Sequence, residues 1–197
     1  MILSLLKKIT EFSILGYTDP VDRGCLLGAT WLGDDPQIAR MAEGKTLVGV
    51  LGIGSIRAAD VQRRKSLFDY LRSLKIGMPP LVSPAAIVNE GVDRGDGLVA
   101  MDGVVVHTGT ILGEAVILNT RCSVDHDCHI GGFTHIAPGA VVCGDVRIGF
   151  GCLIGAGSVI CPGCQIGDEC IIGAGAVVTR DCTEAGTYVG VPARKVA

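Results

Sequence analysis

Three of the four histidines lie close together in the sequence, at His126, His129 and His135. His126 stands between two carboxylates, Asp125 and Asp127. A carboxylate beside an imidazole raises the imidazole pKa and can fix which ring nitrogen carries the proton. The Asp-His-Asp run therefore marks His126 as a candidate general base, whereas a histidine without such neighbours is as well explained as part of a solvated surface.

A regular six-residue period runs through this part of the chain. From Val106 to Val178 every sixth residue is valine, leucine or isoleucine. This period matches neither an α-helical turn nor the alternation of one strand. It is typical of a parallel β-helix, in which three short strands, about eighteen residues, complete one triangular coil. We therefore predict a mainly β fold, a left-handed parallel β-helix of hexapeptide repeats, the hand being that of proteins that carry this repeat.

Two neighbouring columns support the coil. The residue two positions before each aliphatic one is small or β-branched, which suits a narrow interior. The residue after it is often glycine, which we expect at sharp corners. Since the aliphatic and small columns fill the interior, His126, His129 and His135 are expected to face outward or to lie at corners.

Cysteine and histidine spacing gives no support for disulfides or a metal site. Cys161 and Cys164 form one CxxC pair without a second pair at zinc-finger spacing. The histidines, from His107 onward, are separated by 19, 3 and 6 residues, unlike those of zinc-binding β-helix carbonic anhydrases. Five of the nine cysteines fall in the small column, where a thiol acts as a small buried hydrophobe: Cys122, Cys128, Cys152, Cys164 and Cys170. We expect no metal.

The first 82 residues lack the six-residue period. They are predicted to form a small α/β domain, a truncated Rossmann-like unit, ahead of a β-helix domain at residues 83–197. Residues 1–10 have the apolar spacing of a helix. Strands are predicted at residues 12–16 and, as a buried parallel strand, at residues 46–51.

A glycine-containing turn, Gly52-Ile53-Gly54-Ser55, is predicted to lead into a second helix. This helix is expected to bury one apolar face, to expose Arg63, Arg64 and Lys65, and to end at Gly77. Such a turn can cradle a phosphate at a helix start. An ordinary strand-to-helix turn explains it equally well.

Composition limits the classes of partner. The chain has 197 residues, a net charge of −3, 29 glycines and 4% aromatic residues. These values suit a solenoid and give no reason to expect nucleic acid or an anionic membrane surface. No apolar run is long enough to span a bilayer, and the apolar start lacks the charge order of a signal peptide. We expect a cytoplasmic protein with a small-molecule substrate.

Four motifs resemble one enzyme family. They are Val124-Asp125-His126-Asp127-Cys128, His135-Ile136-Ala137-Pro138-Gly139-Ala140, Ile154-Gly155-Ala156-Gly157-Ser158 and Val189-Gly190-Val191-Pro192-Ala193-Arg194-Lys195. They are similar to motifs of the hexapeptide-repeat sugar acetyltransferases that modify sialic acid or the 4-amino group of nucleotide-linked bacillosamine precursors. The resemblance implies a homotrimer, acetyl-CoA in the groove between adjacent coils, a sugar or nucleotide-sugar acceptor and a histidine base.

The resemblance also assigns roles to residues. His126 matches the general base, and Asp127 matches the acidic residue that increases its basicity. His135 matches a histidine that contacts acetyl-CoA. Ala156 and Ala174 match positions that contact the coenzyme through the main chain.

Further site residues are predicted around these. Asp19, Gly52 and Ile53 match acceptor contacts of the family approximately. Gly144 follows His126 by one coil length, so its amide is placed to help hold an oxyanion. Family members begin with a strand and a Gly-x-x-Gly-His turn that holds the nucleotide, whereas this sequence begins at what looks like the following helix. We therefore expect either that the true start lies upstream of Met1 or that the acceptor is a different sugar.

Two other functions remain open at this point. One is an acetyltransferase for another small acceptor such as serine. The other is a non-catalytic β-helix that serves as a scaffold. Coenzyme binding would separate the scaffold from both enzymes.

Overall fold

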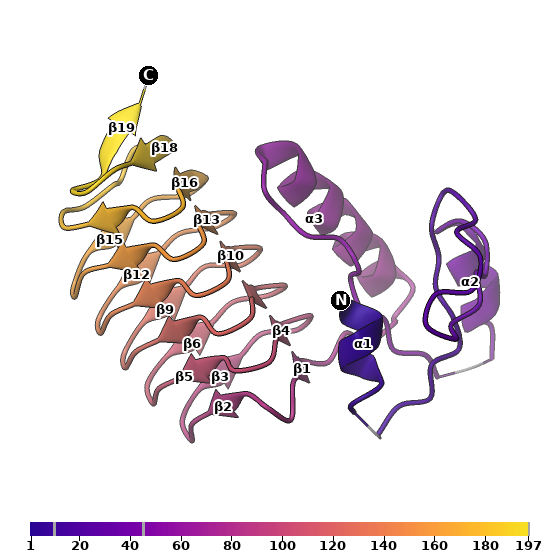
Figure 1. Cartoon of the computed structure of the whole chain (residues 1–197). Coiled ribbons are helices and arrows are strands. Elements are labelled where there is room, and N and C mark those ends of the chain that lie inside the picture. The colour runs from indigo at the N-terminus through magenta and orange to yellow at the C-terminus, as the bar shows by residue number, and fades with distance from the viewer. Residues whose placement is uncertain (10, 45, 197) are drawn as a thin grey trace.

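The computed structural model describes residues 1–9, 11–44 and 46–196 and is dominated by a parallel β-helix (Figure 1). Most strands are two residues long, and each pairs in parallel with the strand one coil away. Val142, for example, is in register with Val124 below it and Ile160 above it, a separation of eighteen residues in each direction. The β-helix predicted from the six-residue period is confirmed.

The strands fall into three faces, because three strands complete a coil. The first face contains β1 (Leu81–Val82), β4 (Val99–Ala100), β7 (Ile117–Leu118), β10 (His135–Ile136), β13 (Leu153–Ile154), β16 (Cys170–Ile172), β18 (Gly186–Val189) and the antiparallel β19 (Arg194–Val196). The second contains β2 (Ile87–Val88), β5 (Val105–Val106), β8 (Ser123–Val124), β11 (Val141–Val142), β14 (Val159–Ile160) and β17 (Val177–Val178). The third contains β3 (Asp93–Arg94), β6 (Ile111–Leu112), β9 (His129–Ile130), β12 (Arg147–Ile148) and β15 (Gln165–Ile166).

The interior of the coil is filled by the two predicted columns. Every member of the aliphatic column from Val106 to Val178 is at most 3% exposed, and every member of the small column from Val104 to Ala176 is at most 6% exposed. A buried aliphatic side chain contributes about 1.5–3 kcal/mol to folding. Because each coil contacts only its neighbours, this stabilisation accumulates coil by coil.

The corners differ from the prediction in one respect. The left-handed backbone conformation falls three residues after the aliphatic column, for example at Asp127 (φ 59°) and Gly139 (φ 67°). The glycines directly after that column are required for another reason. At Gly131 and Gly155 an added Cβ would come within 2.5 Å of the next coil's backbone, so close coil packing excludes a side chain.

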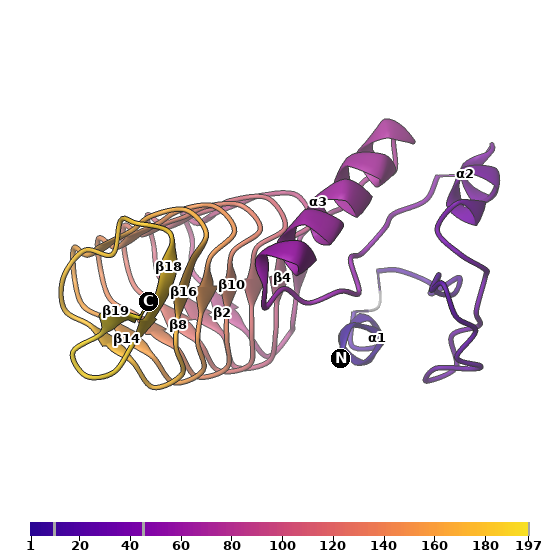
Figure 2. The same ribbon diagram turned by 90° about the horizontal axis from the view of Figure 1, so that it is seen from above.

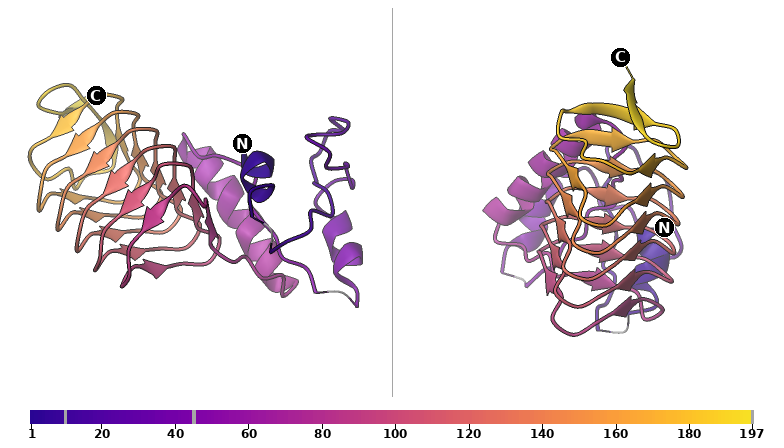
Figure 3. Two further views of the ribbon diagram at one scale, coloured as in Figure 1. Left: turned by 60° about the horizontal axis from the view of Figure 1, so that its bottom comes forward. Right: turned by 90° about the vertical axis from the view of Figure 1, so that its left-hand side faces the viewer.

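The C-terminal hairpin lies over one end of the coil, and α1 lies beside its first turns (Figure 3). The helix predicted within residues 1–10 is confirmed as α1 (Ile2–Leu6), and its Leu5 is 3% exposed within the coil core. At the other end β19 folds back on β18, and the Tyr188 hydroxyl donates to the Glu184 carbonyl (2.8 Å). Apolar residues of the terminal coils are thereby shielded from water.

The strands predicted in the N-terminal region are wrong. Residues 12–16 are extended, and the nearest bridge is the single one that Tyr17, the next residue, makes with Trp31. Residues 46–51 have one bridge, from Val48 to Gly77, and Val48 is 47% exposed rather than buried. A strand is stabilised by a ladder of cross-strand hydrogen bonds. Among the described residues, segment 12–16 has no bridge and segment 46–51 has one.

The helix predicted after the glycine turn is confirmed as α3 (Ala58–Ser73), which lies beside the coil (Figures 1 and 2). The predicted exposure of Arg64 is wrong, because its side chain is fully buried. Its Nη2 donates to the Ala115 carbonyl (2.8 Å), and its guanidinium lies 5.9 Å from the centre of the Phe133 ring. Burial lowers the pKa of Arg64 to about 10. A flat guanidinium can join a helix to a carbonyl and a ring at once.

Aromatic packing completes the attachment of α3. The Phe68 ring lies edge-on to Phe133, with 5.5 Å between centroids, and Phe133 packs in turn on Phe150. The helix ends at Ser73, before Gly77 where its end was expected, and Lys75 takes the left-handed conformation (φ 58°). A further short helix, α2 (Gln37–Ala42), was not predicted. None of the helices in the described part of the chain has the length and apolar content that a bilayer crossing requires.

Candidate active site

His126 lies in the turn between β8 and β9, where the second and third faces meet. Its side chain is 62% exposed, and its Nδ1 is 2.9 Å from Oδ2 of Asp127. The Asp125 carboxylate accepts a hydrogen bond from the His126 backbone N–H (2.9 Å). The predicted base is therefore held on a rigid corner with its acidic neighbours in contact.

The charges around His126 favour its role as a base. The hydrogen bond to Asp127 is the main cause that raises the pKa of His126, and Asp125 and Asp145 add to it. A carboxylate only accepts hydrogen bonds, so Nδ1 carries the proton in the neutral ring. Nε2 is then the atom that can accept a proton from a substrate.

Two glycines make room for this pair. Gly144 lies one coil above His126, and a Cβ at Gly144 would be 2.7 Å from Nε2. Gly109 lies one coil below Asp127, and a Cβ there would collide with the Asp127 carboxylate. The eighteen-residue period identified Gly144 in the sequence. The same arithmetic applied downward from Asp127 would have found Gly109, which was missed.

The N–H groups at three predicted sites are directed away from the protein. Among the described residues, no acceptor receives a hydrogen bond from the backbone N–H of Gly144, Ala156 or Ala174. Ala156 and Ala174 lie one above the other, since the N–H of Gly175 donates to the Ala156 carbonyl (2.9 Å). They occupy the corner between the first and second faces. His126 is at the opposite edge of the second face, so one chain does not bring His126 and Ala156 together.

His135 points out of the coil as expected but is not accessible, because Ser55 and the segment that leads into α3 cover the first face. It is 9% exposed, and its Nδ1 lies 2.9 Å from the Ser55 carbonyl while its Nε2 lies 3.1 Å from Nδ2 of Asn119. The Asn119 Oδ1 accepts from the Thr120 N–H (2.8 Å), which directs the Asn119 amide N–H toward His135. Burial lowers the pKa of His135. His135 is therefore a neutral ring that ties the glycine turn to the coil.

The other histidines lie apart from the His126–Asp127 pair, and the small-column cysteines lie inside the coil. His129 is exposed on the third face, and His107 Nδ1 lies 3.2 Å from Nδ2 of Asn89. Cysteines of the small column are at most 6% exposed, as predicted, and all nine cysteines are free thiols. No group of three or more histidine, cysteine or acidic side chains in the described ranges is arranged to hold a metal ion.

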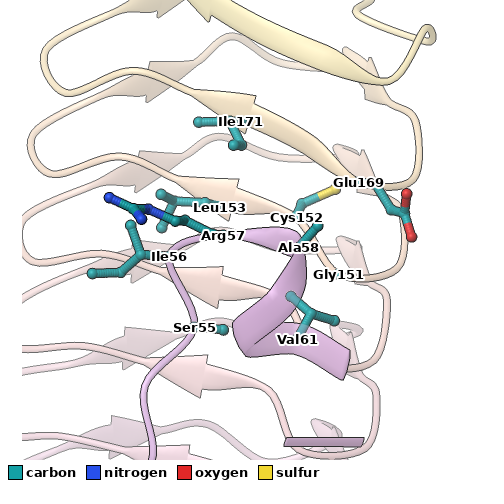
Figure 4. Close-up of a pocket in the computed structure, with 10 residues that line it drawn as sticks. All are labelled: Ser55, Ile56, Arg57, Ala58, Val61, Gly151, Cys152, Leu153, Glu169 and Ile171. Atoms are coloured by element: carbon teal, nitrogen blue, oxygen red, sulfur yellow. The ribbon is translucent and has the colours of Figure 1, made fainter. Parts of the chain in front are cut away.

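Two hollows lie next to α3. Figure 4 shows the smaller, between the first turn of α3 and the first face, with a volume of about 40 Å³, which is too small for a sugar. The larger is open and measures about 490 Å³. It is lined by Asp35, Pro36, Ile53, Arg63, Ser66, Leu67 and Tyr70.

Of the predicted acceptor residues, only Ile53 lines the larger hollow. Asp19 lies nearby, because the adjacent Thr18 hydroxyl donates to Asp35 (2.7 Å). Its own carboxylate accepts from the Val21 N–H (2.9 Å). Gly52 is exposed next to Ile53. The structure therefore places Asp19 and Gly52 near Ile53, but these two residues do not line the larger hollow with it.

The coil matches a known repeat. Residues 145–180 match the family model described as bacterial transferase hexapeptide (six repeats). This part of the coil is similar to transferase hexapeptide repeats. The predicted resemblance to sugar acetyltransferases is confirmed by solved structures that are similar to almost the whole chain.

Three of these structures illustrate the similarity. The acetyltransferase domain of PglB from Neisseria gonorrhoeae FA1090, in complex with acetyl coenzyme A, is 28% identical with a TM-score of 0.89, over 98% of this chain and 91% of that chain. PerB from Caulobacter crescentus, in complex with CoA and GDP-perosamine, is 28% identical with a TM-score of 0.77, over 100% and 91%. A mutant GDP-perosamine N-acetyl transferase from Caulobacter crescentus is 28% identical with a TM-score of 0.78, over 100% and 90%.

We expect Gly144→Ala to lower kcat about 10-fold to 100-fold without unfolding the coil, because the added methyl would push the His126 ring out of place. The backbone of Gly144 is not left-handed, so alanine adds no backbone strain. Steady-state kinetics and the melting temperature would be measured together. Gly139→Ala is the converse comparison, because it adds backbone strain at φ 67° without any clash of the new methyl group. A Gly144→Ala protein with unchanged kcat would contradict this packing argument.

Proposed function

We propose that the protein is an acetyl-CoA-dependent acetyltransferase that acetylates the amino or hydroxyl group of a sugar or nucleotide-sugar. The observation that carries the proposal is the exposed His126–Asp127 pair, 2.9 Å apart, with the N–H of Gly144 one coil above it. The similarity to PglB and PerB, described with acetyl coenzyme A and with CoA and GDP-perosamine, supports the same donor and acceptor class.

The residues of the corner suit direct transfer. His126 Nε2 takes the proton from the acceptor amine or hydroxyl as that group attacks the thioester carbonyl. Asp127 stabilises the imidazolium that forms. The Gly144 N–H donates to the oxyanion, which then collapses with departure of the CoA thiolate. The thiolate or solvent receives the proton from His126, and no covalent enzyme intermediate is required.

The second face supports a homotrimer. Its outward residues form an apolar stripe that runs the length of the coil: Ile87, Val105, Val141, Val159 and Val177, interrupted by Ser123. Ile87 is 59% exposed and Val141 38%, whereas the third face presents Asp93, His129, Arg147 and Gln165 with one isoleucine. If three second faces surround a common axis, the His126 corner of one copy meets the Ala156 corner of the next. Acetyl-CoA would lie in the groove between them.

The acceptor is proposed to enter from the N-terminal region. The larger hollow, about 490 Å³, is of the size that holds a small-molecule ligand and contains Ile53. On its wall, Arg63 offers a cation that can bind a phosphate, and Tyr70 offers a ring on which a nucleobase can stack. We place the reaction in the cytoplasm, where nine free thiols would remain reduced.

Thiol release from acetyl-CoA tests the proposed function. Wild-type protein would be assayed with nucleotide amino sugars, free sialic acids and serine, and His126→Asn would be the matched inactive control. We expect release with at least one nucleotide amino sugar. Release only with serine would favour the alternative acceptor. Failure to bind acetyl-CoA in calorimetry would favour the scaffold.

The pH profile should report His126. A base must be neutral to act, so kcat/KM is expected to fall in acid through a pKa that Asp127 holds above the ordinary histidine value. Asp127→Asn removes the main cause of that shift, so the acidic limb should move to lower pH. The control is Asp93→Asn, because Asp93 lies on the third face two coils below His129 and is not among the groups that shift the pKa of His126. A limb that does not move in Asp127→Asn would separate Asp127 from the titration of the base.

A further inference from the structure

A buried threonine beneath the candidate active site holds both ends of the turn that carries His126. Thr110 is fully buried in the small column, one coil below. Its hydroxyl donates to the Asp125 carbonyl (2.8 Å) and accepts from the Cys128 N–H (3.3 Å). Neither the Asp125 carbonyl nor the Cys128 N–H has another partner among the described residues. One hydroxyl therefore closes the turn before and after His126.

The same turn is connected upward by a thiol. The Cys128 thiol is directed at the Cys143 carbonyl (3.1 Å) and, more weakly, at the His126 carbonyl (3.6 Å). Burial raises the pKa of Cys128, so the thiol keeps the proton that it donates. The Cys143 carbonyl belongs to the peptide group whose N–H is that of Gly144. A donor on one side of this peptide plane fixes the direction of the N–H on the other.

We propose that Thr110 is a positioning residue for catalysis, and that with Cys128 it aligns His126 and the Gly144 N–H across two coils. This inference rests on the proposed function of His126 as the base. Neither side chain reaches solvent, so neither contacts a substrate. Their role is to keep the base and the oxyanion donor in one geometry, since a misplacement of about 1 Å can cost about 100-fold in rate.

The chain contains a matched control for this arrangement. Thr134 donates to the Gly149 carbonyl (2.8 Å) and accepts from the Cys152 N–H (3.0 Å), and the Cys152 thiol contacts the Gly167 carbonyl (3.0 Å). This is the same set of bonds at the corner between the third and first faces. That corner carries no candidate base and packs against α3. Loss of either hydroxyl should therefore lower stability by a similar amount, whereas only loss of the Thr110 hydroxyl should lower activity.

The test compares Thr110→Val with Thr134→Val in the full-length protein. Valine keeps the shape of threonine and removes the hydroxyl, so both variants should lose a similar part of their melting temperature. We expect Thr110→Val to lower kcat about 10-fold to 100-fold with KM for acetyl-CoA changed less than about threefold, and Thr134→Val to stay within about threefold in both. Thr110→Ser, which keeps the hydroxyl, should restore most of kcat.

A second measurement does not depend on turnover. The four histidines can be titrated by NMR, with His126 assigned from the spectrum of His126→Asn. A loosened turn weakens the contact with Asp127, so the pKa of His126 should fall in Thr110→Val and not in Thr134→Val. Equal kcat in the two valine variants together with an unchanged His126 titration would overturn the inference. If wild-type protein releases no thiol with any acceptor, the proposed function fails, while the titration still decides whether Thr110 holds the His126–Asp127 pair.

Discussion

His126→Ala is expected to lower kcat by about 100-fold or more while acetyl-CoA binding stays nearly intact, since a positioned general base contributes about 10²–10⁴ in rate. The ring is 62% exposed, and among the residues that the structure describes its only side-chain hydrogen bond is to Asp127. Its removal should therefore leave the coil stable. The measurement combines thiol release for kcat with calorimetry for acetyl-CoA affinity.

His129→Ala is the matched control for this prediction. His129 is also an exposed histidine of the coil, three residues further on, but it lies on the third face away from the glycine pair. Its loss should change neither kcat nor KM appreciably. Near wild-type turnover in His126→Ala would remove His126 from the mechanism, and an equal loss in both variants would indicate a surface effect rather than a base.

Mixed oligomers should recover activity from two inactive variants. His126→Ala lacks the base, and Ala156→Trp is expected to fill the groove at the opposite edge of the second face; each alone should be nearly inactive. If each site takes His126 from one copy and Ala156 from the next, every mixed trimer contains one intact site. Random mixing of equal amounts should then restore about a quarter of wild-type activity.

The assembly itself must be checked in the same experiment. The two variants would be unfolded, mixed and refolded, or co-expressed with different tags, and trimers containing both tags would be isolated before assay. If each site were contained within a single chain, the mixed trimers would stay inactive. A protein that forms dimers without the groove would also recover no activity on mixing.

Val141→Glu places a charge in the apolar stripe of the second face. It should lower activity about 10-fold or more by dispersing the proposed trimer, and light scattering would measure the loss of the assembly.

The regular part of the molecule could be read from the sequence because each coil repeats one local rule. The column from Val106 to Val178 predicted the buried interior, and the eighteen-residue step placed Gly144 above His126 and Ala174 above Ala156. These relations need no knowledge of distant contacts. The period did not determine the hand of the coil, which came from the resemblance.

What the sequence did not show depends on contacts between the repeat and the rest of the chain. Arg64 was predicted to be exposed, because its neighbours in the sequence do not indicate its contacts. These contacts are the Ala115 carbonyl and the Phe133 ring, both distant in the sequence. His135 looked exposed in the repeat frame, yet Ser55, 80 residues away in sequence, covers it. Strands at residues 12–16 and 46–51 were predicted from apolar runs that find no continuous partner.

The threefold recurrence of the faces limits how such a chain can change in length during evolution. A face returns only after eighteen residues, as the register of Val124, Val142 and Ile160 shows. Insertion of a single hexapeptide between Asp127 and Gly144 would keep every buried column intact and still rotate Gly144 to another edge. The fold would survive and the reaction centre would be dismantled. Insertions and deletions in this interval would therefore break the site even where they keep the repeat, because a whole coil placed there would also separate His126 from its glycine.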